Sequence, residues 1–93
     1  SSAKIYIDDG ATKAINNGKS LLPAGIIRVL GNFKKVENIL IVDKNKNELA
    51  RGLSSFSSIE IQKIKGLQSS QIENILGYSS KSEIIHKDDM VKL

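Results

Sequence analysis

The sequence predicts one domain over residues 1–93 with a mixed β fold and short α-helices, in which a small curled sheet or β pseudo-barrel carries helices at its ends. Three observations lead to this prediction. Five or six short segments before and after residues 57–77 have the alternating or continuous apolar pattern of strands. Between residues 57 and 77 the period changes to about 3.6. A chain of 93 residues is also too short for a β-sandwich plus a helical layer.

The first predicted elements are a strand over residues 4–8 and a short helix after it. Ile5 and Ile7 lie two residues apart and therefore share one face of the strand. The apolar stripe of the helix consists of Ala11, Ala14 and Ile15. Asp8 or Asp9 can cap the helix, and Gly18 can end it in the left-handed conformation.

A tight turn and a second strand are predicted next. Pro23 has a fixed φ and Gly25 tolerates unusual backbone geometry, so this segment turns the chain sharply. The apolar segment 26–30 follows, and we expect a strand buried on most of both faces. Arg28 within it must reach solvent or a partner.

The rest of the chain predicts a hairpin, a helix pair and two final strands. Residues 38–42 and 48–53 flank a polar turn and form the hairpin. Two S-x-x-E capping boxes, at residues 57–60 and 70–73, each begin a helix that a glycine closes. We expect strands at residues 82–86 and from Met90 to Leu93, with the apolar end docked on the fold.

Composition excludes several classes of protein. The chain has no cysteine, so disulfides and thiolate metal sites are excluded. The lack of cysteine suits a reducing cytoplasm, where we expect the protein to be located. No apolar run approaches the ~18 residues that span a bilayer, so we expect no membrane partner. The net charge of +4 comes mainly from scattered lysines, which are typical of a solvated surface. Ser1-Ser2-Ala3 carries no pattern and is interpreted either as the tail of a linker or as a remnant that is not native to the protein.

No residue pattern predicts catalysis, cofactor binding or metal binding by this chain. His86 is the single histidine, and we expect a structural, hydrogen-bonded role for it. The acidic pair Asp8-Asp9 is explained by the start of the first helix. Gly18-Lys19-Ser20 imitates the end of a phosphate-binding loop, but Pro23 prevents a helix from following it.

Five motifs in order give the sequence a family likeness. They are GKSLLPAGI at residues 18–26, GLSSFSS at 52–58, IKGL at 64–67, ILGY at 75–78 and IHKD at 85–88. In this order they resemble the PUA domain found at the C-terminus of glutamate 5-kinases, and the likeness extends from residue 4 to residue 93. The resemblance implies a β pseudo-barrel with one early helix and a late helix pair.

The resemblance also implies a role. A PUA domain of this kind is a non-catalytic accessory or regulatory domain of an enzyme that opens proline biosynthesis. ATP and Mg²⁺ would then bind an amino-acid-kinase domain of the parent chain, absent from this sequence, which would also be this domain's partner. The parent enzyme is expected to be a homo-oligomer.

RNA binding is the alternative, because PUA domains also occur in RNA-modifying enzymes. In those that bind RNA, the loop between the first helix and the second strand approaches the RNA backbone. The residues that this implies here are Lys13, Lys19, Ser20, Pro23, Gly25 and Arg28. These cations can equally be ordinary surface residues, and the chain offers only four aromatic side chains for base stacking.

Overall fold

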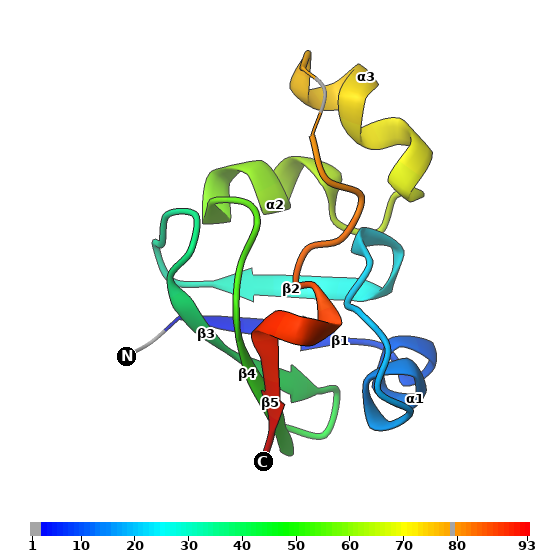
Figure 1. The fold of residues 1–93 in the computed structure, drawn as a ribbon, viewed down its shortest axis with the longest axis vertical. Coiled ribbons are helices and arrows are strands. Elements are labelled where there is room, and N and C mark those ends of the chain that lie inside the picture. Colours follow the sequence, from blue (N-terminus) through cyan, green and yellow to red (C-terminus); the bar gives the residue numbers. More distant parts are fainter. Residues whose placement is uncertain (1–2, 79) are drawn as a thin grey trace.

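The computed structural model describes residues 3–78 and 80–93, and within them the chain forms a curled five-stranded sheet with short helices at its ends (Figure 1). The strands are β1 (Lys4–Ile7), β2 (Ile26–Leu30), β3 (Asn38–Asp43), β4 (Glu48–Leu53) and β5 (Met90–Lys92). Their order in the sheet is β2-β1-β3-β4-β5, with β1 and β3 parallel and the other pairs antiparallel. The predicted mixed β fold with short helices is confirmed.

The helices lie at the ends of this sheet. They are α1 (Asp9–Asn16), α2 (Ser58–Ile64) and α3 (Ile72–Leu76), and three short 3-10 turns accompany them, η1 (Pro23–Gly25), η2 (Ser69–Gln71) and η3 (Lys87–Asp89). Figure 1 shows α1 near one end of the sheet and the α2–α3 pair near the other. The early helix and the late helix pair therefore follow the prediction.

The hydrophobic core lies on one face of the sheet. The central strands β1 and β3 supply Ile5, Ile7, Ile39 and Ile41, whose side chains are fully buried. Residues two apart on a strand point to the same face, so these four isoleucines line the core together. The core also includes Ala3, whose carbonyl accepts a hydrogen bond from the Leu40 N–H at 3.2 Å. Ser1 and Ser2, the rest of the predicted linker remnant, lie outside the described residues.

The prediction that residues 26–30 are buried on both faces is wrong. β2 is the edge strand of the sheet and pairs only with β1, and its residues Ile27 and Arg28 are exposed to solvent. Ile26 and Val29 are buried, whereas Ile27 is half exposed. Arg28 reaches a partner on the exposed face, because its guanidinium lies 5.6 Å from the centre of the Tyr6 ring.

The predicted hairpin is confirmed, and so is its polar turn. β3 and β4 pair antiparallel, with a register shift after Ile41. The Asp43 carboxylate accepts hydrogen bonds from the N–H groups of Asn45 and Asn47 and from the Asn47 side chain. These bonds, chiefly that from the Asn47 side chain, lower the pKa of Asp43.

The predicted strand at residues 82–86 is wrong, although its apolar residues are buried. Ile84 and Ile85 are inaccessible to solvent, but this segment makes a single bridge with Leu21. The Leu21 N–H donates to the Ile85 carbonyl at 2.9 Å, and the Ile84 N–H donates to the Leu21 carbonyl at 2.8 Å. The apolar pair Ile84 and Ile85 anchors this segment to the core, and the segment joins no strand of the sheet in the described structure.

The predicted final strand exists as β5, and its backbone is docked as expected. Its three residues pair with β4, and the Leu93 N–H donates to the Leu49 carbonyl at 3.0 Å. The apolar side chains of Val91 and Leu93, however, are exposed rather than packed on the core.

Among the described helices none is long and apolar enough to cross a membrane.

The helix pair is confirmed, but only one of its two capping boxes forms. Ser57 and Glu60 exchange the two bonds of a capping box at the start of α2. The second box is wrong, because Ser70 lies inside the turn η2 and the N-cap position of α3 is Gln71, without a side-chain bond. A 3-10 turn leading into a helix moves its start past the residue that the pattern marks.

Candidate functional site

The candidate site is built where α1 begins and η1 ends. The Asp8 carboxylate caps α1 by accepting the Ala11 N–H at 2.8 Å, and the Asp8 carbonyl accepts the Thr12 hydroxyl at 2.8 Å. The Asp8 N–H donates to the Gly25 carbonyl at 2.9 Å. One residue therefore starts the helix and joins it to the turn that is distant in sequence.

Gly25 brings the two segments into close contact. Its φ lies outside the left-handed region, so its backbone angles do not demand glycine. A Cβ at this position would lie only 2.4 Å from the Ala11 Cβ, however, and 3.5 Å from the Ala11 Cα. The sequence suggested unusual backbone geometry as a reason for this glycine, whereas the structure shows close approach to another segment.

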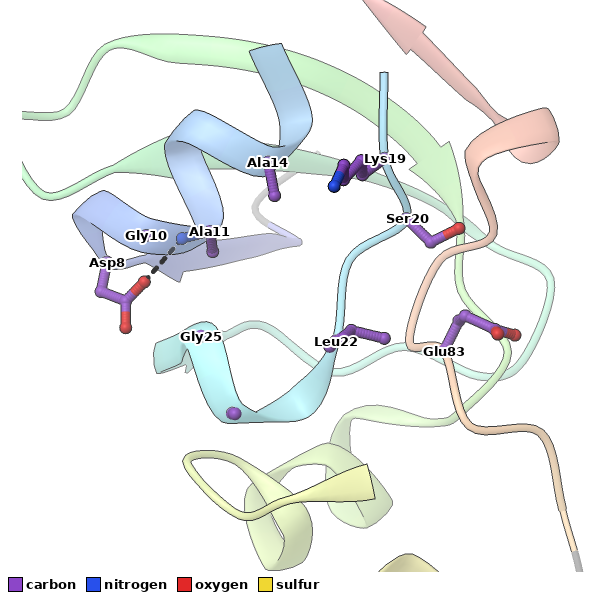
Figure 2. Close-up of a pocket in the computed structure, with 10 residues that line it drawn as sticks. Asp8, Gly10, Ala11, Ala14, Lys19, Ser20, Leu22, Gly25 and Glu83 are labelled. Atoms are coloured by element: carbon purple, nitrogen blue, oxygen red, sulfur yellow. Dashed lines mark hydrogen bonds between the residues drawn. The ribbon is translucent and has the colours of Figure 1, made fainter. Parts of the chain in front are cut away.

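An open groove of about 430 Å³ lies between α1 and the segment that enters η1. Figure 2 shows α1 on one side of the groove, residues 19–25 on the other, and Glu83 on a third segment beyond Leu22. Ala11, Ala14 and Leu22 supply apolar lining, and the Leu22 side chain is half exposed. The groove can thus receive an apolar group with polar contacts at its margins.

The structure brings together three of the six residues predicted to contact RNA or a partner. Lys19, Ser20 and Gly25 line the groove, and the Lys19 side chain extends toward it in Figure 2. The Ser20 hydroxyl already accepts a hydrogen bond within the fold, from the Lys87 N–H at 2.8 Å.

The other three predicted residues lie elsewhere. Pro23 is buried, and its carbonyl accepts the Gly66 N–H at 2.7 Å. Lys13 is exposed on α1 without lining the groove. Arg28 projects from β2 over Tyr6. The three candidate cations therefore do not converge on one phosphate-binding surface.

The charge of the groove is mixed. Asp8 and Glu83 contribute carboxylates to its lining, and Lys19 is its one lining cation among the described residues. Neighbouring carboxylates repel a phosphate backbone, so this lining favours RNA less than the sequence suggested. Sequence reasoning missed Glu83 because contacts between residues far apart in sequence, such as the bridge between Leu21 and Ile85, bring its segment to the groove.

Most aromatic side chains are engaged within the fold. Phe33 and Phe56 are buried, and Arg28 lies over Tyr6. The Lys35 ammonium lies 5.5 Å from the centre of the Tyr78 ring. The Tyr78 hydroxyl donates to the Glu60 carboxylate, which raises the pKa of Tyr78.

The same hydrogen bond also shifts the pKa of Glu60. Partial burial acts to raise the pKa of Glu60, but the hydrogen bonds from Tyr78 and from the Ser57 N–H outweigh it, and the net effect is a lowered pKa. These two residues tie the start of α2 to the segment after α3.

His86 has a structural contact, as the sequence suggested. Its Nδ1 accepts the Asp88 N–H at 3.1 Å and so caps η3. Within residues 3–78 and 80–93, no group of three or more His, Asp or Glu side chains is placed to hold a metal ion. The groove therefore offers groups for binding a ligand: the ammonium group of Lys19, the carboxylates of Asp8 and Glu83, and an apolar lining.

Comparison with known proteins gives one matching family and a consistent set of relatives. Residues 3–76 match the family described as the PUA domain. The chain is 61% identical over 89 residues to the glutamate 5-kinase of Pelagibacter ubique, covering 96% of this chain and 24% of that protein. It is 45% identical over 93 residues to the glutamate 5-kinase of Thermoanaerobacter sp., covering 99% and 25%. The chain thus spans about a quarter of the length of these relatives.

Solved structures share the fold at low sequence identity. A PUA domain from Aeropyrum pernix, crystallised as a tartrate complex, superimposes with a TM-score of 0.67 at 14% identity, covering 91% of this chain and 41% of that one. The archaeal box H/ACA sRNP Nop10-Cbf5 complex gives a TM-score of 0.63 at 23% identity, covering 94% and 26%. At these identities the likeness concerns the fold alone.

Proposed function

The chain belongs to the PUA domain family, and from that premise we propose that it is the non-catalytic accessory domain of a glutamate 5-kinase. The observation that carries the proposal is the 61% identity to a glutamate 5-kinase across 96% of this chain. The match covers only 24% of that relative, which leaves room for a separate kinase domain in a parent of similar length.

In this proposal the parent enzyme transfers the γ-phosphoryl group of ATP to the γ-carboxylate of glutamate, the first step of proline biosynthesis, in the cytoplasm. Glutamate, ATP and Mg²⁺ bind the kinase domain, since phosphoryl transfer needs metal-binding carboxylates and a phosphate cradle. The PUA domain contributes to regulation or assembly of a homo-oligomeric enzyme.

The test compares the full-length kinase with a version that ends before this domain. We expect the shortened enzyme to keep measurable phosphoryl transfer while its dependence on Mg²⁺ concentration or its response to inhibitors changes. Complete loss of transfer in a shortened enzyme that is still folded and still assembled as the full-length enzyme is would contradict the non-catalytic role. Calorimetry of the 93-residue chain with Mg-ATP is the companion measurement, and no saturable heat is expected.

RNA binding is the second candidate. In other PUA domains the loop between the first helix and the second strand contacts RNA, and here Lys19 and Gly25 of this loop line an open groove. Three phosphate contacts, by Lys13, Lys19 and Arg28, would give a log-log salt slope of about −2 for single-stranded RNA. Since these cations are dispersed, a shallower slope is expected in fluorescence-anisotropy titrations. Tight, salt-resistant preference for one RNA, lost in a Lys19→Ala/Arg28→Ala variant, would instead place RNA recognition first.

A further inference from the structure

The strand β5 presents two different faces. Met90 and Lys92 face α1, where they line a small depression with Ile15, and the Lys92 ammonium donates to the Asn16 carbonyl at 3.0 Å. Val91 and Leu93 alternate with them and therefore point to the opposite side. The exposed fractions of Val91 and Leu93 are 69% and 66%.

Two more aliphatic residues continue this exposed surface. Leu53 on β4 is 38% exposed, and Val36 in the loop before β3 is 69% exposed. Leu53 and Asp89 line both of two depressions, one of which also includes Val36 and the other Val91 and Leu93. We call the surface formed by Val36, Leu53, Val91 and Leu93 the β5 face.

Val36 is held in an unfavourable conformation on this face. Its φ is 67°, in the left-handed region that a β-branched residue rarely adopts because the conformation is strained. The Val36 N–H donates to the Ser54 carbonyl at 2.7 Å, which holds the loop in place. Both the backbone strain and the exposed aliphatic side chain are unfavourable in the monomer, and a contact that covers Val36 would offset part of that cost.

The edge of β5 is open to another strand. β5 pairs with β4 and with no other strand in the described part of the chain, so one row of its backbone groups lacks a strand partner (Figure 1). Proteins commonly protect such edges with an outward lysine. Lys92 does not serve this purpose, because its ammonium is bound to Asn16 on the other side.

The charges around the β5 face have both signs. Arg51 lies beside Asp88 and Asp89 along one depression, and Lys35 and Lys81 flank the other. A polyanion would be repelled by the two carboxylates. A second copy of the same surface, related by a two-fold axis, can place each Arg51 against the acidic residues of the other copy.

We propose that the β5 face packs against the same face of a second copy of this chain across a two-fold axis. The contact covers the four aliphatic residues of the face and pairs Arg51 of each copy with Asp89 of the other. It lies apart from the groove between α1 and η1, and it does not depend on the identity of the parent enzyme.

Sedimentation and light scattering of the 93-residue chain over a wide range of concentration test the proposal. The expected mass rises with concentration from 10.2 kDa toward twice that value. Val91→Asp should keep the protein monomeric throughout. Ile59→Asp is the matched control, because Ile59 is 65% exposed on α2, outside the β5 face, and this variant should still dimerise. Circular dichroism checks that both variants are folded.

A charge exchange tests the pairing itself. Arg51→Glu and Asp89→Lys should each weaken self-association, because each places like charges together across the two-fold axis. Their mixture should form a heterodimer in which opposite charges meet again. The proposal is overturned by a wild type that stays monomeric at every concentration, by a dimer that Val91→Asp leaves intact, or by a mixture that associates no better than either variant alone.

Discussion

The helices α2 and α3 share one sequence pattern but lie in different environments. Each is preceded by S-x-x-E and closed by a glycine, yet α2 buries Ser58, Ile61 and Ile64, whereas α3 buries only Ile72. The capping box forms at α2 alone. A local signature of this kind therefore specifies a helix, while the contacts around it determine where the helix begins and how firmly it is held.

Contacts at both ends of α2 explain the difference. At its start, the Ser58 N–H donates to the Phe33 carbonyl at 2.9 Å and the Phe33 N–H donates to the Ser58 hydroxyl at 3.1 Å. Beyond its end, Gly66 donates to Pro23 of η1. α3 instead follows the turn η2, where the Ser69 hydroxyl donates to the Ser82 carbonyl at an exposed position.

The largest predicted effect comes from removing a buried side chain of α2. Ile61 is fully buried, so Ile61→Ala should lower the free energy of unfolding by about 2–5 kcal/mol. Ile75 on α3 is 46% exposed, and Ile75→Ala should change it by less than about 0.5 kcal/mol. Urea denaturation measures both. Similar losses for the two variants would mean that α3 is packed as firmly as α2.

The next effect tests the turn that anchors the end of α2. Gly25→Ala places a Cβ 2.4 Å from that of Ala11, so η1 must shift, and we expect a loss of about 1–3 kcal/mol. The control is Gly10→Ala, where the nearest atom, Asp8 Oδ1, lies at 3.6 Å and alanine favours the helix. Thermal denaturation should show a lower midpoint for Gly25→Ala alone, and equal midpoints would refute the close contact.

A smaller effect separates the two capping boxes. Ser57→Ala removes the bond that the Ser57 hydroxyl accepts from the Glu60 N–H and should cost ~1 kcal/mol. Ser70→Ala removes no side-chain cap from α3 and should be nearly neutral. The measurement is again the free energy of unfolding in urea. If Ser70→Ala costs as much as Ser57→Ala, the second capping box exists in solution.

The smallest predicted effect concerns the bond between Tyr78 and Glu60, which links the two helices. The pKa of Glu60 is lower in the folded protein than in the unfolded chain, so the ionised carboxylate stabilises the fold at neutral pH. This contribution to stability is lost as pH falls through the folded pKa of Glu60. The pKa of Tyr78 is raised, so its contribution is present below the unfolded value of about 10 and is lost as pH rises through the folded pKa.

Tyr78→Phe removes this bond and tests both pH dependences. The stability advantage of the wild type should be greatest between the titration of Glu60 and that of Tyr78, and it should shrink at lower and at higher pH. It should be small throughout, because Tyr78 is 39% exposed. Unfolding in urea at several pH values measures it, and an advantage that is constant with pH would contradict the assigned bond.

The sequence by itself determined the elements whose causes are local. Alternation of Ile5 and Ile7, an aspartate cap at residue 8 or 9, the hairpin turn after β3 and the capping box at Ser57 all act within a few residues, so each was predictable from residue spacing. The family likeness, which rests on the order of such motifs, was predictable for the same reason.

Tertiary structure alone decided the features that depend on which segments meet. The order of strands made β2 an edge and left Val91 exposed, and neither follows from the apolar composition of those strands. The groove depends on residues 19–25 and Glu83 lying near α1, and the close contact of Gly25 depends on Ala11. Such contacts join residues far apart in sequence, and local propensity carries no information about them, because they form only when the core packs and fixes the distance between distant segments.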